Sequence, residues 1–124
     1  ALTLQFDTTN ALRILGVFPL PGKSHYIHGN ILLRELARRG HQVDMVSHFP
    51  SKKPIENFRE ISLQGSLAQT YNNLTINETQ TFTGFSLSKF LNIAGEKPCE
   101  LLGTKYLEEL MKTPKGTYDV IIVE

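Results

Sequence analysis

The sequence contains a single cysteine, Cys99, among its 124 residues. One cysteine cannot form an internal disulfide, and it supplies neither the cysteine pairs of a zinc cluster nor a cysteine-pair redox motif. These three kinds of site are therefore excluded within this sequence. The cysteine count leaves the cellular compartment undecided.

Long hydrophobic runs and blocks of like charge are also missing. No segment approaches the roughly 18 consecutive apolar residues that predict a membrane-spanning helix. The 13 basic and 12 acidic residues are interspersed and give a net charge of +1. No strongly charged surface is expected, so nucleic acid is not predicted as a partner. We expect a chain that is soluble as given.

The composition, 40% hydrophobic and 20% charged, suits one globular unit with a buried core. Residues 11–124 are assigned to that unit. Residues 1–10 lack the basic start and apolar stretch of a signal peptide, which leaves two interpretations. They are the remnant that follows signal-peptide removal, or a poorly ordered lead-in to the first strand.

The main feature of the sequence is a predicted strand, loop and helix. The apolar run at 12–18 predicts a strand, and the proline- and glycine-containing residues 19–22 end it. Apolar residues then recur at helical spacing until Gly40, which is typical of the residue that follows a helix with a basic last turn. The β-branched run at 42–48 predicts a second strand. The two strands are therefore expected to be parallel and joined by a right-handed crossover.

The remaining residues predict further strands and helices. Residues 58–63 alternate apolar with polar and predict a third strand, and helical spacing predicts helices at 85–94 and 100–112, split at 95–98. Four consecutive apolar residues within 118–124 predict a central strand covered by helices on both faces. The predicted fold class is α/β, a Rossmann-like parallel sheet with flanking helices. Because no loop and helix follow the last strand, we expect a longer protein.

Two phosphate-binding motifs are ruled out. Gly22-Lys-Ser resembles the end of a phosphate-binding loop, but that motif requires a glycine where this sequence has Val17. Pro19 and Pro21 also remove amide donors that phosphates would need. No Gly-x-Gly-x-x-Gly follows the first strand, so the dinucleotide fingerprint is missing as well. Neither a nucleoside triphosphatase nor a nicotinamide-dependent oxidoreductase is predicted.

His25 is the candidate catalytic residue. It lies in the first turn of the predicted helix, at the carboxyl edge of the sheet, where open α/β sheets bind ligands. The positive end of the helix dipole disfavours the imidazolium form, so a neutral ring is available as a general base. Position alone leaves a second interpretation, in which His25 only caps the helix or packs on the loop.

The other three histidines are weaker candidates. His28 shares a helical face with His25, but no third ligand at suitable spacing is visible, and no metal site is predicted. His41 is expected at the surface, at the sheet edge away from the cleft. His48 ends the second strand on the cleft side and is a secondary candidate for ligand contact.

Two glycosylation sequons lie close together in the polar stretch 69–83. They are Asn73-Leu-Thr and Asn77-Glu-Thr. The pair predicts glycosylation in a secretory lumen. The alternative is that the sequons reflect only the asparagine- and threonine-rich composition of this stretch.

Three stretches of the sequence resemble a known family. They are Ala11-Leu-Arg-Ile-Leu-Gly-Val-Phe-Pro-Leu-Pro-Gly-Lys-Ser-His-Tyr, Leu36-Ala-Arg-Arg-Gly-His-Gln-Val-Asp-Met-Val-Ser and Tyr118-Asp-Val-Ile-Ile-Val-Glu. Together they resemble the amino-terminal half of membrane-bound UDP-glycosyltransferases, insect members most closely. The Ser-His step and the Arg-Gly-His-Gln-Val turn are the more specific features. The resemblance implies a two-domain GT-B fold, with this chain forming most of the acceptor-binding domain and the sugar nucleotide bound mainly by a carboxyl-terminal domain.

The resemblance also implies a reaction and a set of roles. The histidine matching His25 takes the proton of an acceptor hydroxyl while the hydroxyl oxygen attacks the anomeric carbon of a UDP-sugar and inverts its configuration. The expected hexose is glucose. The family's orienting aspartate is expected just beyond Glu124, so neither Asp119 nor Glu124 is assigned its role, and this chain alone is expected to be inactive. The implied acceptor-binding residues are Ser24, Tyr26, Phe82, Phe85, Phe90 and Leu91. For the helical aromatic residues among them, the alternative is plain core packing.

The remaining implications concern partners and location. The resemblance implies a small lipophilic acceptor, no cofactor because the UDP-sugar is a co-substrate, and a role in detoxification. It further implies a cleaved signal peptide, a catalytic part in the lumen of the endoplasmic reticulum and a carboxyl-terminal membrane anchor. The alternative from another functional class is a non-catalytic α/β domain that binds a small apolar ligand.

Overall fold

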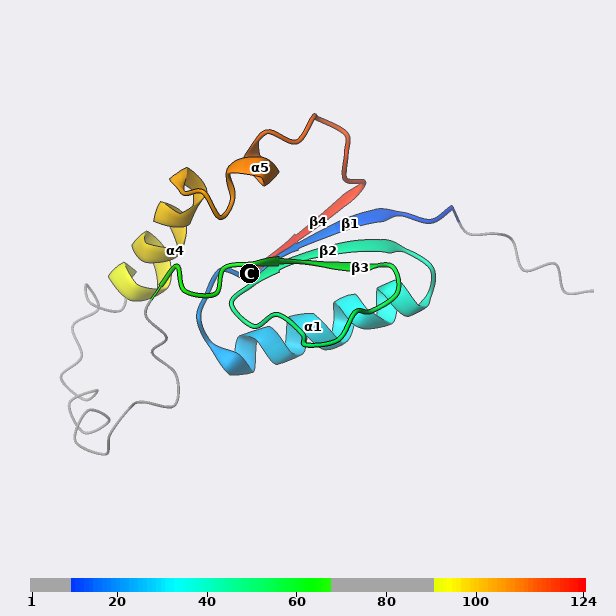
Figure 1. Ribbon diagram of the computed structural model, residues 1–124, viewed down its shortest axis with the longest axis horizontal. Helices are drawn as coiled ribbons and strands as arrows, with labels where there is room; N and C mark the ends of the chain where they lie inside the picture. The colour runs from blue at the N-terminus through cyan, green and yellow to red at the C-terminus, as the bar shows by residue number, and fades with distance from the viewer. Residues whose placement is uncertain (1–9, 68–90) are drawn as a thin grey trace, which may run out of the picture.

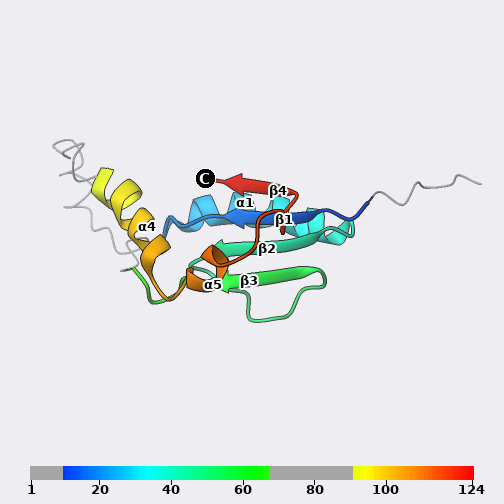
Figure 2. The same cartoon turned by 90° about the horizontal axis from the view of Figure 1, so that it is seen from above.

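The computed structural model describes residues 10–67 and 91–124 (Figure 1). Its four strands form one parallel sheet in the order β3-β2-β1-β4. Figure 2 shows the strands side by side in this order. The sheet consists of β1 (Arg13–Val17), β2 (Gln42–Ser47), β3 (Phe58–Ser62) and β4 (Val120–Val123). The predicted α/β class and the four predicted strands are confirmed.

The helices lie on both faces of the sheet. Helix α1 (Lys23–Arg38) covers one face, and α5 (Glu108–Met111) lies over the other (Figure 1). Helix α4 (Lys97–Glu100) lies beyond the carboxyl ends of the strands (Figure 2). None of the helices in the described part of the chain is long and apolar enough to cross a membrane.

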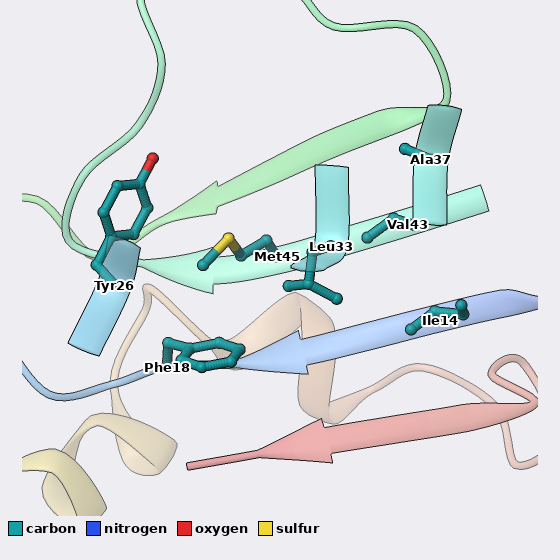
Figure 3. Close-up of a cluster of buried hydrophobic side chains, with 7 residues drawn as sticks. All are labelled: Ile14, Phe18, Tyr26, Leu33, Ala37, Val43 and Met45. Carbon is teal, nitrogen blue, oxygen red and sulfur yellow. The ribbon is translucent and has the colours of Figure 1, made fainter. Parts of the chain in front are cut away.

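Each face of the sheet has its own hydrophobic core, because successive side chains of a strand point to opposite sides. Figure 3 shows the core between α1 and the sheet, in which side chains of β1, β2 and α1 meet. It comprises Ile14, Phe18, Tyr26, Leu33, Ala37, Val43 and Met45. The core on the opposite face comprises Leu15, Val46, Leu63, Leu101 and Leu107.

Helix α1 packs closely on the sheet because glycine stands at one of its contact positions. Its buried residues recur at helical spacing and include Gly29. A Cβ atom at Gly29 would lie 2.3 Å from the Phe18 ring. The helix ends before Gly40, whose φ of +94° lies in the left-handed region that favours glycine, as the sequence predicts.

The second helical region differs from the prediction. A π-helix at Asn92–Glu96 continues directly into α4 and then into a 3₁₀ turn at Leu101–Gly103, so the predicted break at 95–98 is wrong. Pro98 stands in the first turn of α4, directly after the π-helix, so it lies where the helical geometry changes. The chain turns instead at Thr104, which is extended. That turn allows both Leu101 and Leu107 to enter the second core.

Strand β4 lies at the edge of the sheet in the described part of the chain. A central strand covered on both faces was predicted for the sheet of a longer protein, and this stays a prediction. The exposed fractions of Val120, Ile121 and Val123 are 38%, 59% and 67%. Only Ile122 packs against the α1-side core, because that core lies over β1 and β2.

Candidate functional site

The candidate site lies at the carboxyl ends of β1 and β4. The backbone N–H of Glu124 donates to the carbonyl of Val17 (3.1 Å), and the N–H of Phe18 donates to the carbonyl of Val46 (3.0 Å). The loop that follows β1 then leads into α1, whose N-cap is Gly22. His25 therefore occupies the first turn of α1 at the carboxyl edge of the sheet, as the sequence predicts.

His25 and Glu124 are in direct contact. Nδ1 of His25 hydrogen-bonds to Oε1 of Glu124. The exposed fractions of the two side chains are 52% and 30%, so the pair faces solvent rather than the core. No hydrogen bond to Nε2 of His25 is made by the residues that the structure describes.

This pairing determines which ring nitrogen of His25 carries the proton. If Glu124 is ionised it can only accept, so Nδ1 carries the proton and the lone pair of the neutral ring lies on Nε2. A carboxylate on one ring nitrogen also stabilises the positive charge that the ring gains when the other nitrogen takes a proton. The arrangement matches a general base with its orienting carboxylate. The capping role was the alternative for His25, but the N-cap residue is Gly22, and Nδ1 of His25 bonds to Glu124 rather than to the N-terminus of the helix.

Sequence reasoning set Glu124 aside because it was only near the expected site. The signal that identifies it is the parallel register, in which Val17 pairs with Val123, so that the residues after both strands meet at one edge. Asp119 lies at the opposite end of β4, as expected. Its carboxylate accepts the backbone N–H of Arg13 at 2.8 Å.

The predicted acceptor-binding residues have different positions. Ser24 is exposed beside His25, and Leu91 is 54% exposed. Tyr26 points the other way: it is buried in the α1-side core, and its ring centroid lies 5.1 Å from that of Phe49. Its position is that of a core residue rather than of a ligand-contacting one. The predicted residues that lie outside the described part of the chain are Phe82, Phe85, Phe90 and the sequon residues Asn73 and Asn77.

The remaining histidines contact backbone groups. Nδ1 of His28 lies 2.9 Å from the carbonyl oxygen of Ser24, and Nδ1 of His41 accepts the N–H of Leu12 at 3.1 Å. His48 is buried, and its Nε2 donates to the carbonyl of Pro19 at 2.9 Å. Burial lowers the pKa of His48 below its ordinary value, although the carbonyls of Pro19 and Leu63 partly offset this effect. Among the residues that the structure describes, no group of three potential metal ligands is found.

Comparison with known proteins gives two significant relatives, both from Dactylopius coccus. The chain is 36% identical over 102 residues to a protein named UDP-glucosyltransferase 2, a match that covers 81% of this chain and 20% of the relative. It is 33% identical over 92 residues to one named UDP-glycosyltransferase UGT5, covering 74% of this chain and 17% of the relative. The chain thus spans about a fifth of the length of the curated relatives it matches. No family model and no solved structure matches it.

Proposed function

We infer that this chain is part of a UDP-glycosyltransferase, and that it forms the acceptor-binding side of a two-domain GT-B enzyme. The identity to two proteins named for this activity extends over most of the chain, and the resemblance noted in the sequence is thereby confirmed. The parallel α/β sheet with helices on both faces agrees with such a domain. In this proposal, residues 11–124 belong to the acceptor domain, and the UDP-sugar is bound mainly by a carboxyl-terminal domain.

The proposed reaction is transfer of a hexose from a UDP-sugar to a hydroxyl of a small lipophilic acceptor. Nε2 of His25 takes the hydroxyl proton while the acceptor oxygen attacks the anomeric carbon from the face opposite the leaving group. The new carbon–oxygen bond forms as the bond to UDP breaks, so the anomeric configuration is inverted and UDP leaves with the electron pair. Glucose is the proposed sugar because one relative is named a glucosyltransferase.

The contact between His25 and Glu124 is the observation that carries this mechanism. A general base requires a free lone pair that the substrate can approach and a partner that holds the ring. Half of the His25 side chain is exposed, and Nδ1 is the nitrogen that Glu124 occupies. In the proposed mechanism, the acceptor hydroxyl approaches Nε2 from solvent.

The test is His25→Ala in the full-length protein, assayed by transfer of labelled sugar from UDP donors to a panel of phenols and sterols. Loss of a general base should lower kcat by about a hundredfold or more. Binding of the UDP-sugar, measured by calorimetry, should remain close to that of the unaltered protein.

His28→Ala is the matched control because His28 lies one turn further along the same helix and is also exposed. Unchanged turnover in His25→Ala would refute the proposed base. Acceptor binding without any transfer by the unaltered protein would instead support the non-catalytic alternative.

The proposal extends to location. We propose that the acceptor domain faces the lumen of the endoplasmic reticulum, anchored through a carboxyl-terminal segment, and that it carries glycans at Asn73 and Asn77. A glycosidase-sensitive mass shift that disappears in the Asn73→Gln and Asn77→Gln double variant is the expected result. A mass that glycosidase does not change would contradict the lumenal location.

A further inference from the structure

A buried histidine holds the loop that leads to His25. His48 directly follows β2, and only 1% of it is exposed. Its Nε2 donates to the carbonyl of Pro19, at 2.9 Å. Pro19 belongs to the loop between β1 and α1, so this hydrogen bond joins the end of β2 to the segment from which the His25-bearing helix begins.

The loop makes few backbone hydrogen bonds of its own. Two of its residues, Pro19 and Pro21, have no backbone N–H to donate. The N–H of Phe18 is bonded to Val46 before the loop, and the helix is established after it by the bond from Tyr26 N–H to the carbonyl of Gly22 (3.1 Å). The hydrogen bond from His48 is placed between these two points.

The residue after His48 contacts the first turn of α1. The ring of Phe49 packs on that of Tyr26, the next residue after His25. The ammonium group of Lys23 lies 4.6 Å from the centroid of each of these rings. The two residues that follow β2 therefore contact the loop before α1 and the first turn of α1, to which His25 belongs.

We propose that His48 is a positioning residue for His25, acting through its hydrogen bond to the Pro19 carbonyl. This inference rests on the proposed function. Because Nε2 donates to a carbonyl, the neutral ring of His48 has its proton on that nitrogen, and its Nδ1 makes no hydrogen bond with the residues that the structure describes. His48 thus acts as a fixed donor and is itself too deeply buried to contact substrate.

The test compares three variants of the full-length protein. His48→Leu removes the donor, and His48→Gln retains an amide N–H at nearly the reach of Nε2. His48→Asn keeps the same chemical group but is too short to reach Pro19. His41→Gln is the control, because His41 also bonds a backbone group, at the opposite end of the β1–β2 pair.

We expect kcat to fall by about tenfold to a hundredfold in His48→Leu and His48→Asn, the effect of a small displacement of a catalytic group. The KM for UDP-sugar should stay within about twofold, because the proposed function places the donor mainly in a carboxyl-terminal domain. His48→Gln should recover most of kcat. His41→Gln should retain full kcat. If His48→Leu does not fold, the comparison of His48→Gln with His48→Asn still decides the question.

Two results would overturn the inference: full kcat in His48→Asn, or equal losses in His48→Gln and His48→Asn. Assaying His25→Ala in parallel separates this inference from the proposed function. Full activity in His25→Ala would refute the base itself, whereas an inactive His25→Ala with a fully active His48→Asn would refute only the positioning role.

Discussion

The carboxylate of Glu124 contacts Nδ1 of His25, although 99 positions separate the two residues in the sequence. The contact arises because β4 pairs in parallel with β1, so that the residue after β4 reaches the loop and helix that follow β1. Neither residue is buried, and the pair lies at the carboxyl edge of the sheet, exposed to solvent. The proposed mechanism depends on this single long-range contact.

Removing the charge of Glu124 should weaken catalysis without abolishing substrate binding. Glu124→Gln retains the size of the side chain, but an amide can donate as well as accept and no longer keeps the proton of His25 on Nδ1. We therefore expect kcat to fall by roughly tenfold to a hundredfold with little change in KM. Steady-state kinetics of the full-length protein measure the effect. Asp119→Asn is the control at the other end of β4 and should leave kcat unchanged. Equal kcat in Glu124→Gln and the unaltered protein would show that the carboxylate has no part in catalysis.

Adding one methyl group at Gly29 should destabilise the domain. The new Cβ would lie 2.3 Å from the Phe18 ring, which is rigid and buried, so α1 or the ring must move. We expect Gly29→Ala to lower the free energy of unfolding by about 1–3 kcal/mol, measured by urea denaturation. Gly95→Ala is the matched control. Apart from its own helix, no described residue has an atom within 4 Å of the added Cβ, and alanine favours helix, so stability should be equal or slightly higher. A Gly29→Ala protein as stable as the Gly95→Ala protein would contradict the close packing of α1.

Stability should decline at alkaline pH partly because of Tyr118. Burial and the hydrogen bond to Asp44 (2.6 Å) raise the pKa of Tyr118 above its ordinary value of 10.0. The folded chain then holds the phenolic proton more tightly than the unfolded chain does. This contribution is complete below about pH 10 and is lost as the pH rises through the folded-state pKa. Tyr118→Phe should reduce the fall in unfolding free energy above about pH 10. An identical alkaline profile would refute this assignment.

The opposite pH dependence is expected from His48. Burial lowers the pKa of His48 below its ordinary value of 6.5, so the unfolded chain takes up a proton that the folded chain resists. The stability contributed by the neutral ring is present above about pH 6.5 and is lost as the pH falls toward the folded-state pKa. His48→Gln does not titrate and should show a smaller loss of unfolding free energy between about pH 7 and pH 5. A slope equal to that of the unaltered protein would show that His48 is accessible to protons in the folded state.

Helix breaks were predicted less well than strands. The strands are short runs of apolar residues bounded by proline, glycine or polar residues, and all four were found from this local signal. The break at 95–98 was inferred from a glycine and a proline, but both are accommodated where the helical geometry changes from π to α. The true turn lies at Thr104, directly after Gly103, a glycine that the predicted helix at 100–112 included. It is set by the need to bury Leu101 and Leu107 in the same core, which is a property of the packed chain.

The sequence by itself determined the strand–loop–helix that carries His25, the parallel α/β class and the similarity to UDP-glycosyltransferases. These follow from periodicity, from proline and glycine at fixed places, and from residue identity, all of which are local. Only the tertiary structure decided that Glu124 contacts His25, that Tyr26 is buried in the core and that His48 bonds to Pro19. These relationships depend on which strands pair and in what register, and strand pairing joins residues whose distance along the chain carries no local signal.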